Sequence, residues 1–486
     1  MTTTQFRQGD LQAVLEHLAA ADPDRDLVPC GIARILLGRD QLERVADEVT
    51  ALLGAGAGDR PQVVLLVDAT PIRRGTQDVK AEVGERLRTR FDVRIHVLTD
   101  EHPVLHADEH ILELASRAAQ GAAAVVTVGG GTVTDVGKIA SQAAGGVPLV
   151  TVQTAASVDG FTDNVSVVLR SGVKRTVDSR WPDVVIADAE VISQAPAAMN
   201  RAGFGEITSM FTAPADWRLA NALGVDSTFH AVPIQLLEAV GSDIGDWSSG
   251  VAVADVAAVE RLTWALAVRG IATGVSGTTA CLSGVEHLVS HMLDLHNGEH
   301  GLAMGLHGAQ VGVASVVAAV AWELLFERLA AGVPALRLPE SERAHAEVTA
   351  AFAHLGTGSI AQECWRDYSR KLEQWTASTG RIEGVLSSWA DLEPELRRLL
   401  LPAAKIAAHL RSAGAPARFA ELEPAVSPEL ARWAVANCAT MRNRTTVVDL
   451  LAALGWWTPD DVDEVLRRAD SAAAPPDAGT AAGVAR

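Results

Sequence analysis

Four polar residues in apolar, glycine-rich segments of the second half of the chain have side chains that can bind a metal ion. Glu206 directly follows the glycine-containing turn predicted at 202–205, and His307 begins a long apolar stretch. His287 and His291 are spaced i and i+4, so they share one face of a helix. One carboxylate and two or three imidazoles from separate helices suit Zn²⁺, Fe²⁺ or Ni²⁺ with one position left open. Such an ion would polarise an alcohol or carbonyl oxygen.

Each of these residues also has an ordinary structural interpretation. His287 and His291 could be hydrogen-bonded histidines of the core. Glu206 could be an acid at a helix N-terminus, stabilised there by the helix dipole. The spacing alone does not join the segments, so it leaves both interpretations open.

A glycine-rich turn, residues 129–131, lies between the apolar run 123–128 and the start of a predicted helix. Thr132 and Thr134 are placed where they can cap that helix. Backbone N–H groups at such a turn, with a helix start behind it, form a site suited to a pyrophosphate. A plain tight turn between a strand and a helix is the alternative.

A second small-residue turn follows the next apolar run, residues 147–152. It contains Thr154 and Ser157, and Asp159 lies at its end. Two buried strands with a helix between them form the βαβ unit of a parallel sheet. Asp159 could bind a substrate hydroxyl or simply stabilise the turn. The closeness of the two turns in sequence favours a ligand site.

Asp68 stands at the end of the predicted strand 62–67. A carboxylate there can accept both ribose hydroxyls of an adenosine and would repel the extra phosphate of NADP, so it favours NAD. An ordinary turn aspartate is the alternative. In the standard Rossmann order the glycines precede the acid, whereas here the acid precedes the glycines. We therefore predict a nucleotide-binding domain with a different chain order.

The alternation of strand and helix patterns from about residue 30 to 190 predicts an open parallel α/β sheet. From Pro196 to Arg468 the pattern is helical, which predicts a second, all-α domain. The predicted domains are an N-terminal extension 1–29, an α/β NAD-binding domain 30–193, a helical metal and substrate domain 194–470, and a disordered tail 471–486. The other predicted elements are helices at 11–21, 41–53, 79–90 and 108–121 and strands at 32–37 and 93–98.

Composition narrows the class of protein. The 486 residues carry a net charge of −19, which argues against nucleic-acid binding. The cysteines have no CxxC spacing, which argues against a disulfide framework or a structural zinc site. No signal-peptide pattern opens the chain, and the apolar stretch 311–322 is too short to span a membrane. We expect a cytoplasmic protein in which that stretch is a core helix. The four cysteines are Cys30, Cys281, Cys364 and Cys438.

Several segments together resemble a known family. They are, in order, GGGTVTDVGK, PLVTVQTAASVDG, VVIADAEVISQAP, RAGFGEITS with ADW, SGVEHLVSHMLD and LHGAQVGV. The chain resembles the sn-glycerol-1-phosphate dehydrogenases, within the group of iron-containing alcohol dehydrogenases, glycerol dehydrogenases and dehydroquinate synthases. The segments 365–369 and 442–450 are similar to the bacterial branch, and the resemblance covers about residues 30–460.

The resemblance implies roles for individual residues. It implies metal binding by Glu206, His287 and His307. It implies substrate contacts from Asp159, Glu206 and His291, with Asp159 and His291 also catalytic. The cofactor, NAD or possibly NADP, would be bound by Asp68, Gly129, Gly130, Gly131, Thr132, Asp135, Thr154, Ser157 and Asp163.

Two residues depart from the pattern of this family. Glu206 stands where the family has a metal-binding aspartate, and its extra methylene requires compensation elsewhere in the site. Asp163 stands where the family has a small hydroxyl residue, and adds a second acid near Asp159. Dehydroquinate synthases use a glutamate with two histidines, so Glu206 is compatible with the wider group.

These observations predict a metal-dependent, NAD(P)-linked dehydrogenase that interconverts a polyol phosphate and its ketone, first of all sn-glycerol 1-phosphate and dihydroxyacetone phosphate. A sugar-phosphate cyclase or lyase that retains NAD, a dehydrogenase recruited to another substrate, and a binding protein that has lost the metal are the alternatives. Lys174 and Arg175, in a hairpin-like segment, could meet a phosphate or form a solvated pair. The bacterial branch implies a homodimer.

Overall fold

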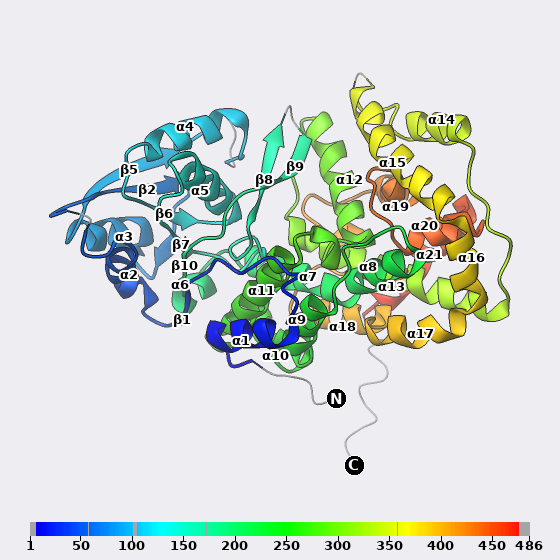
Figure 1. The fold of residues 1–486 in the computed structure, drawn as a ribbon, viewed down its shortest axis with the longest axis horizontal. Helices are drawn as coiled ribbons and strands as arrows, with labels where there is room; N and C mark the ends of the chain where they lie inside the picture. Colours follow the sequence, from blue (N-terminus) through cyan, green and yellow to red (C-terminus); the bar gives the residue numbers. More distant parts are fainter. Residues whose placement is uncertain (1–5, 57, 101–104, 171–172, 357, 476–486) are drawn as a thin grey trace, which may run out of the picture.

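The computed structural model describes residues 6–56, 58–100, 105–170, 173–356 and 358–475. In Figure 1 the chain from β1 (Arg34–Gly38) to β10 (Val184–Asp188), blue to teal, forms a sheet with helices on both faces, and the green to red remainder is a helical assembly beside it, against which the N-terminal helix also lies. The predicted fold class, an α/β half followed by a helical half, is confirmed. The domain limits remain predictions. The prediction of a disordered tail from residue 471 is wrong at its start, because the last helix ends at Ala472. The part of the tail from 476 on lies outside the described residues.

Six parallel strands form the main sheet, in the order β1-β10-β7-β6-β2-β5. Two antiparallel hairpins, β3–β4 and β8–β9, lie outside it. The sheet strands are β1 (Arg34–Gly38), β2 (Gln62–Asp68), β5 (Asp92–Leu98), β6 (Ala124–Gly129), β7 (Leu149–Gln153) and β10 (Val184–Asp188). The hairpin strands are β3 (Arg73–Arg74), β4 (Gln77–Asp78), β8 (Val165–Arg170) and β9 (Val173–Asp178).

Helices cover both faces of the sheet, which explains the continuous apolar runs of its strands. Val63 and Leu65 of β2 pack under α2 and α3, whereas Val64 and Leu66 pack under α4 and α5. Alternate side chains of one strand therefore enter two separate cores. The helices of this half are α2 (Val45–Leu53), α3 (Val79–Arg88), α4 (Glu109–Ala119), α5 (Gly131–Ala143) and α6 (Ala189–Ser193), with a 3₁₀ helix η1 (Gln41–Arg44) before α2. The N-terminal helix α1 (Leu11–Ala21) instead packs into the core of the helical half through Leu11, Val14 and Leu18.

The chain reverses its direction across the sheet beside β2. From β2 it passes to the edge strand β5, then returns to β6 on the other side of β2 and continues to β7 and β10. Val67 of β2 pairs with Val128 of β6, so the following residues, Asp68 and Gly129, end neighbouring strands at the same edge. Ligands of open α/β sheets bind outside the carboxyl ends of the strands at such a reversal.

The helical half surrounds α13 (His307–Ala331), which is buried by α7, α12, α18 and α21. This helix has the length and hydropathy of a membrane span, but 94% of its most apolar window is buried inside the protein. The prediction of a core helix at 311–322 is therefore confirmed. The other long helices are α7 (Ala197–Ile207), α8 (Ala213–Leu223), α9 (Ala231–Gly241), α10 (Ile244–Ala252), α11 (Val256–Ser276), α12 (Val285–Glu299), α14 (Ser341–Ala351), α15 (Ser359–Ala377), α16 (Thr379–Ser387), α17 (Trp389–Arg398), α18 (Ala403–Ser412), α19 (Pro428–Asn437), α20 (Val447–Ala453) and α21 (Pro459–Ala472). Short 3₁₀ turns lie at η2 (Thr208–Phe211), η3 (Thr279–Cys281), η4 (Phe419–Glu421) and η5 (Cys438–Thr440).

The predicted capping of α5 is wrong in detail. The helix begins at Gly131 and its N-cap is Gly130, which has no side chain to offer. Thr132 and Thr134 lie inside the first turn, and the Thr134 hydroxyl donates to the Gly130 carbonyl at 3.2 Å. The helix therefore starts with exposed backbone N–H groups rather than with a side-chain cap. This leaves those groups available to an anion.

Candidate metal centre and cofactor turns

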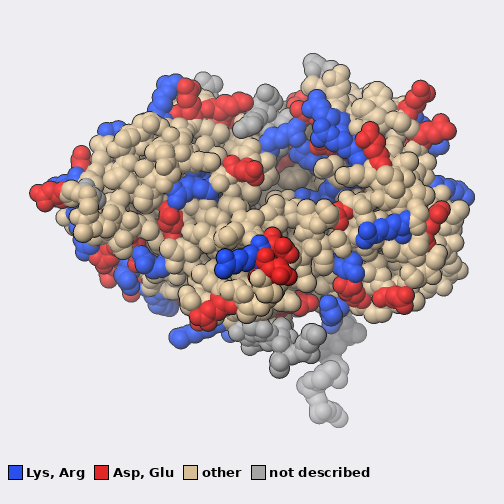
Figure 2. All heavy atoms as spheres, viewed as in Figure 1, with Lys and Arg blue, Asp and Glu red and all other residues tan. Residues whose placement is uncertain are grey.

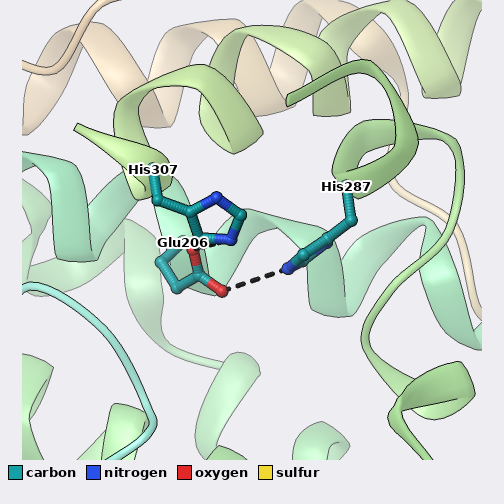
Figure 3. Close-up of side chains that lie close together, drawn as sticks. All are labelled: Glu206, His287 and His307. Atoms are coloured by element: carbon teal, nitrogen blue, oxygen red, sulfur yellow. Dashed lines mark hydrogen bonds and ion pairs between the residues drawn. The ribbon is translucent and has the colours of Figure 1, made fainter. Parts of the chain in front are cut away.

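Glu206, His287 and His307 converge from three helices of the second half. They come from α7, α12 and α13, and one potential donor atom from each lies within 4.8 Å of the others. Glu206 Oε1 lies 3.3 Å from His287 Nε2, and Glu206 Oε2 lies 3.7 Å from His307 Nε2. Figure 3 shows the carboxylate between the two imidazole rings. The structure therefore joins three residues that the spacing alone did not join.

Glycines allow the helices that carry Glu206 and His307 to touch. A Cβ added to Gly205 would lie 2.2 Å from the carbonyl oxygen of Gly308. A Cβ added to Gly308 would lie 2.2 Å from the carbonyl oxygen of Ala202. Because no larger residue fits at this crossing, α7 and α13 meet backbone to backbone. Glu206 and His307, each next to one of these glycines in sequence, are thereby placed side by side.

Hydrogen bonds on the far side of both imidazoles turn their Nε2 atoms towards Glu206. His287 Nδ1 lies 3.1 Å from a carboxylate oxygen of Glu286, so it is the protonated nitrogen. Ser290 donates its hydroxyl to Gln310 Oε1 at 2.7 Å and so accepts from His307 Nδ1 at 3.0 Å. Such outer hydrogen bonds select the tautomer whose Nε2 lone pair binds a metal.

The charges at this cluster match those of a cation site. Burial raises the pKa of Glu206, but the neighbouring histidines outweigh it and hold that pKa well below its usual range. Burial lowers the pKa of His287, yet hydrogen bonds to Glu206 and Glu286 raise it to about 9, so the metal-free imidazole is protonated near neutral pH and must lose its Nε2 proton when it binds an ion. Glu206 Oε2 is buried and accepts no hydrogen bond within the part of the chain that the structure describes. A carboxylate with one unsatisfied oxygen facing His307 Nε2, and its other oxygen facing His287 Nε2, fits a divalent ion.

Asp216 fixes the start of the helix that carries His287. Its carboxylate accepts the backbone N–H of Val285 at 3.1 Å and that of Val447 at 2.8 Å. Burial and the charge of Glu286 raise the pKa of Asp216 well above its usual value. Sequence analysis assigned no role to this residue, although it belongs to the segment ADW on which the resemblance partly rests.

Arg269 on α11 is a second residue of the site that sequence analysis missed. Its guanidinium is wholly buried and lies 3.2 Å from Asp159 Oδ2 and 3.1 Å from Glu206 Oε1. It also donates to the backbone carbonyl of Glu206. The sequence feature that could have identified Arg269 is that it is the one charged residue within the apolar run 262–275. A charged side chain in such a run is rarely buried without a partner.

The two small-residue turns lie against each other and against the helix that carries Glu206. The backbone N–H of Thr154 donates to the carbonyl of Gly129 at 3.3 Å. The N–H of Ala156 donates to the Asn200 side chain of α7 at 3.0 Å. The predicted cofactor turns are therefore next to the metal cluster, and Asp159 follows directly behind them. Their cofactor contacts, including those predicted for Thr132, Thr154 and Ser157, remain predictions.

Asp135 and Asp163 share a buried lysine. Lys138 Nζ lies 2.5 Å from Asp163 and 3.6 Å from Asp135. Burial raises the pKa of Asp135 to about 7, against the lowering effect of Lys138. The negative charge that Asp163 adds near Asp159 in the sequence is thus offset by Lys138. The cofactor roles of both aspartates remain predictions. In this structure both carboxylates are buried beside Lys138.

Asp68 ends β2 beside the glycine turn, as a residue that binds the ribose requires. Its carboxylate lies 2.5 Å from Lys80 Nζ. Lys80 also donates to the carbonyl of Thr70. The lysine places a positive charge beside Asp68 and offsets its negative charge, so the preference for NAD argued from Asp68 alone is weakened. The ribose contact itself remains a prediction.

His291 lies one turn beyond His287 on α12. Its ring centroid is 6.4 Å from that of His287 and 5.7 Å from that of His307. It therefore borders the cluster without belonging to the three donor groups, which agrees with a substrate contact. A cavity of about 560 Å³ further along α12 is lined by His296, His354 and Trp433 and by none of the predicted site residues.

The segment with Lys174 and Arg175 forms the predicted hairpin, β8–β9. Arg175 makes an ion pair with Glu363 of α15. Burial and the charges of Arg442 and Arg366 lower the pKa of Arg175, so these arginines lie close together. Figure 2 shows basic side chains gathered on the face where β9, α12 and α15 lie in Figure 1. The side chain of Lys174 lies outside the described residues.

Comparisons with known proteins agree with this fold and site. Residues 41–196 match the family model described as iron-containing alcohol dehydrogenase. A glycerol-1-phosphate dehydrogenase (NAD(P)+) from Geobacillus thermodenitrificans is 33% identical over 240 residues, which cover 48% of this chain and 58% of that protein. One from Natronomonas pharaonis is 31% identical over 288 residues, which cover 58% of this chain and 75% of that protein.

Solved structures extend the likeness in fold to nearly the whole chain. The glycerol dehydrogenase of Schizosaccharomyces pombe matches with a TM-score of 0.58 and 14% identity, covering 92% of this chain and 91% of that one. From the sequence relatives, this chain belongs to the glycerol-1-phosphate dehydrogenase family, within the iron-containing alcohol dehydrogenases. It spans 58% of the length of the Geobacillus relative.

Proposed function

We propose that this protein is a metal-dependent, NAD(P)-linked dehydrogenase that interconverts sn-glycerol 1-phosphate and dihydroxyacetone phosphate. The observation that carries the proposal is the convergence of Glu206, His287 and His307. These donors are linked through Arg269 to Asp159, directly behind the predicted cofactor turns. Metal donors next to a nucleotide turn suit hydride transfer at a carbinol carbon.

In this proposal Glu206, His287 and His307 would hold one divalent ion, and the ion would supply a Lewis acid at the reacting oxygen. The backbone N–H groups at the start of α5 would hold the pyrophosphate of the cofactor. Arg269 fixes Asp159 through Oδ2, so Oδ1 is left to orient a hydroxyl of the substrate. His291, at the border of the cluster, would carry the proton that the substrate hydroxyl gains or loses.

The relatives support the choice of substrate, since those compared above are named glycerol-1-phosphate dehydrogenases. The arginines Arg175, Arg366 and Arg442 give an acidic chain a local basic surface that suits a phosphorylated substrate. We propose zinc, nickel or iron as the ion. We propose a homodimer as the assembly, following the bacterial branch of the family.

The deciding experiment is a turnover assay with dihydroxyacetone phosphate and NADH or NADPH, using chelator-treated enzyme with Zn²⁺, Ni²⁺ or Fe²⁺ added back. We expect metal-dependent loss of the reduced cofactor. His287→Ala and Glu206→Ala should lower kcat/KM by about 10³-fold or more, because each removes a ligand of the ion. Arg343→Gln, on the exposed face of α14, should keep wild-type activity. Full turnover after complete metal removal would contradict the proposal.

Glu206 favours a second candidate, a sugar-phosphate cyclase or lyase that keeps NAD bound. Its carboxylate occupies the place in the cluster that an aspartate occupies in the dehydrogenases that the sequence resembles. An enzyme of this kind oxidises and reduces its substrate in one cycle and releases no NADH. Absence of net NADH change, together with product formed from a sugar phosphate and NAD retained through gel filtration, would favour it over the dehydrogenase.

A further inference from the structure

The buried side chain of Arg269 and the proposed metal ion would both bind the carboxylate of Glu206. Arg269 Nη2 lies 3.1 Å from Glu206 Oε1, and Arg269 also donates to the backbone carbonyl of Glu206. Glu206 Oε2, which faces His307 at 3.7 Å, is the oxygen that accepts no hydrogen bond among the described residues. An ion bound there would therefore meet one oxygen of Glu206 while the arginine keeps the other.

Arg269 is held where it is by a second acid. Its Nε and Nη2 atoms lie 3.3 and 3.2 Å from Asp159 Oδ2. The guanidinium has no exposed surface, so water does not screen its charge. A buried arginine of this kind stays protonated and must be balanced by carboxylates. Asp159 and Glu206 supply that balance when no ion is present.

We propose that Arg269 is a built-in counter-cation that competes with the metal ion for Glu206 and so weakens metal binding. The physical reason is linkage between two cations. The arginine stabilises the metal-free protein by neutralising Glu206 and Asp159, and an added ion must share that negative charge with it. Metal binding gives up part of this stabilisation, so the net free energy of metal binding is less favourable by that amount. This inference rests on the metal site proposed above.

Arg269 also provides the compensation that the extra methylene of Glu206 requires. By holding Oε1 and the backbone carbonyl of the same residue, Arg269 fixes the rotamer of Glu206 and directs Oε2 towards His307. In this role Arg269 is a positioning residue, since it acts on the ion through Glu206, and in our proposal the cost of its charge outweighs this benefit to metal binding.

The test compares Zn²⁺ affinity in wild-type protein and in Arg269→Met, by competition with a chromophoric chelator on the full chain. We expect Arg269→Met to bind Zn²⁺ about tenfold more tightly or better, because one cation is removed from contact with a ligand. Its metal-free form should melt at a lower temperature than wild type, and added Zn²⁺ should restore more of the loss. Arg269→Gln, which keeps an N–H donor for the carboxylates, serves if Arg269→Met does not fold.

Arg218→Met is the matched control, since Arg218 makes a partly buried ion pair with Glu395 away from the cluster. It should leave Zn²⁺ affinity unchanged. If wild type binds Zn²⁺ and neither neutral variant binds it more tightly, this inference is wrong while the metal site stands. If neither wild type nor the variants bind Zn²⁺, the metal site and this inference both fail.

Discussion

Lys138 brings a single positive charge into a fully buried position between two acids. It neutralises Asp163 at 2.5 Å and lies farther from Asp135, at 3.6 Å. Burial raises the pKa of both acids against the lowering effect of Lys138, and it raises the pKa of Asp135 to about 7. Asp135 also accepts the backbone N–H of Val167, which ties α5 to the β8–β9 hairpin. One carboxylate beside the glycine turn thus changes charge near neutral pH.

This pKa predicts a pH dependence of stability. The folded-state pKa of Asp135 lies above its ordinary value of 3.8, so the folded state favours the neutral acid. That contribution to the free energy of unfolding is fully present below about pH 4 and is lost as pH rises to about 7. Urea unfolding should therefore show that Asp135→Asn gains stability relative to wild type between pH 4.5 and 7.5.

Asp178→Asn, exposed on β9, is the control and should parallel wild type over the same range. If the free energy of unfolding changes with pH in the same way for wild type and Asp135→Asn, then the pKa of Asp135 is the same in the folded and unfolded chain and the prediction is wrong.

At the scale of elements, the metal cluster depends on how closely α7 and α13 cross. The crossing is made by Gly205 and Gly308, whose backbones leave no room for a Cβ. Asp216 performs a related task for α12, since it accepts the N–H that begins that helix. Glu206, His287 and His307 are therefore positioned by helix contacts, which are more rigid than loops.

Gly308→Ala should push α13 away from α7, because the added methyl meets the carbonyl of Ala202. We expect the free energy of unfolding to fall by about 1–3 kcal/mol, the usual cost of overpacking. Zn²⁺ affinity should fall with it, since Glu206 and His307 separate. Denaturant unfolding and metal titration measure the two effects.

Gly384→Ala is the matched control, because Gly384 lies inside α16 with open space around its Cβ position. This change should raise stability by about 0.5–1 kcal/mol and leave metal binding unchanged. Equal metal affinity in Gly308→Ala and wild type would show that the crossing does not set the cluster.

At the scale of the molecule, charge is distributed unevenly. The chain carries a net charge of −19, yet Arg175, Arg366 and Arg442 lie close together where the β9 hairpin meets α15. Asp367 and Glu363 offset part of this charge by pairing with Arg442 and Arg175. A small basic surface on an acidic protein raises the local concentration of small anions, which suits the phosphorylated substrate proposed above.

Arg442→Gln should therefore raise the KM for dihydroxyacetone phosphate about three- to tenfold and change kcat less, since the charge acts on binding. The KM for unphosphorylated dihydroxyacetone should change little. Steady-state kinetics at low and high salt measures both, and the difference should shrink as salt rises. An equal rise for both substrates would indicate a structural effect of Arg442 instead.

The sequence alone predicted most of the local structure, although its prediction of a side-chain cap for α5 was wrong. The periods of apolar residues predicted the parallel strands, the helices and the core helix at 311–322, and the glycines at 129–131 predicted the turn at a strand end. Motifs identified Glu206, His287 and His307 as candidates, although joining them needed the resemblance to a family. These features depend on neighbours within a few residues, which is the range over which a pattern can be interpreted.

Only the tertiary structure decided which charges meet. Arg269 pairs with Asp159, 110 positions away in sequence, and with Glu206, 63 positions away. Lys138 neutralises Asp163, and Lys80 neutralises Asp68, through contacts that the sequence left unspecified. Such partners are selected by helix packing and strand order, because electrostatic attraction in a buried site depends on distances of a few ångströms. The chemistry of the site therefore depends on contacts that no local pattern encodes.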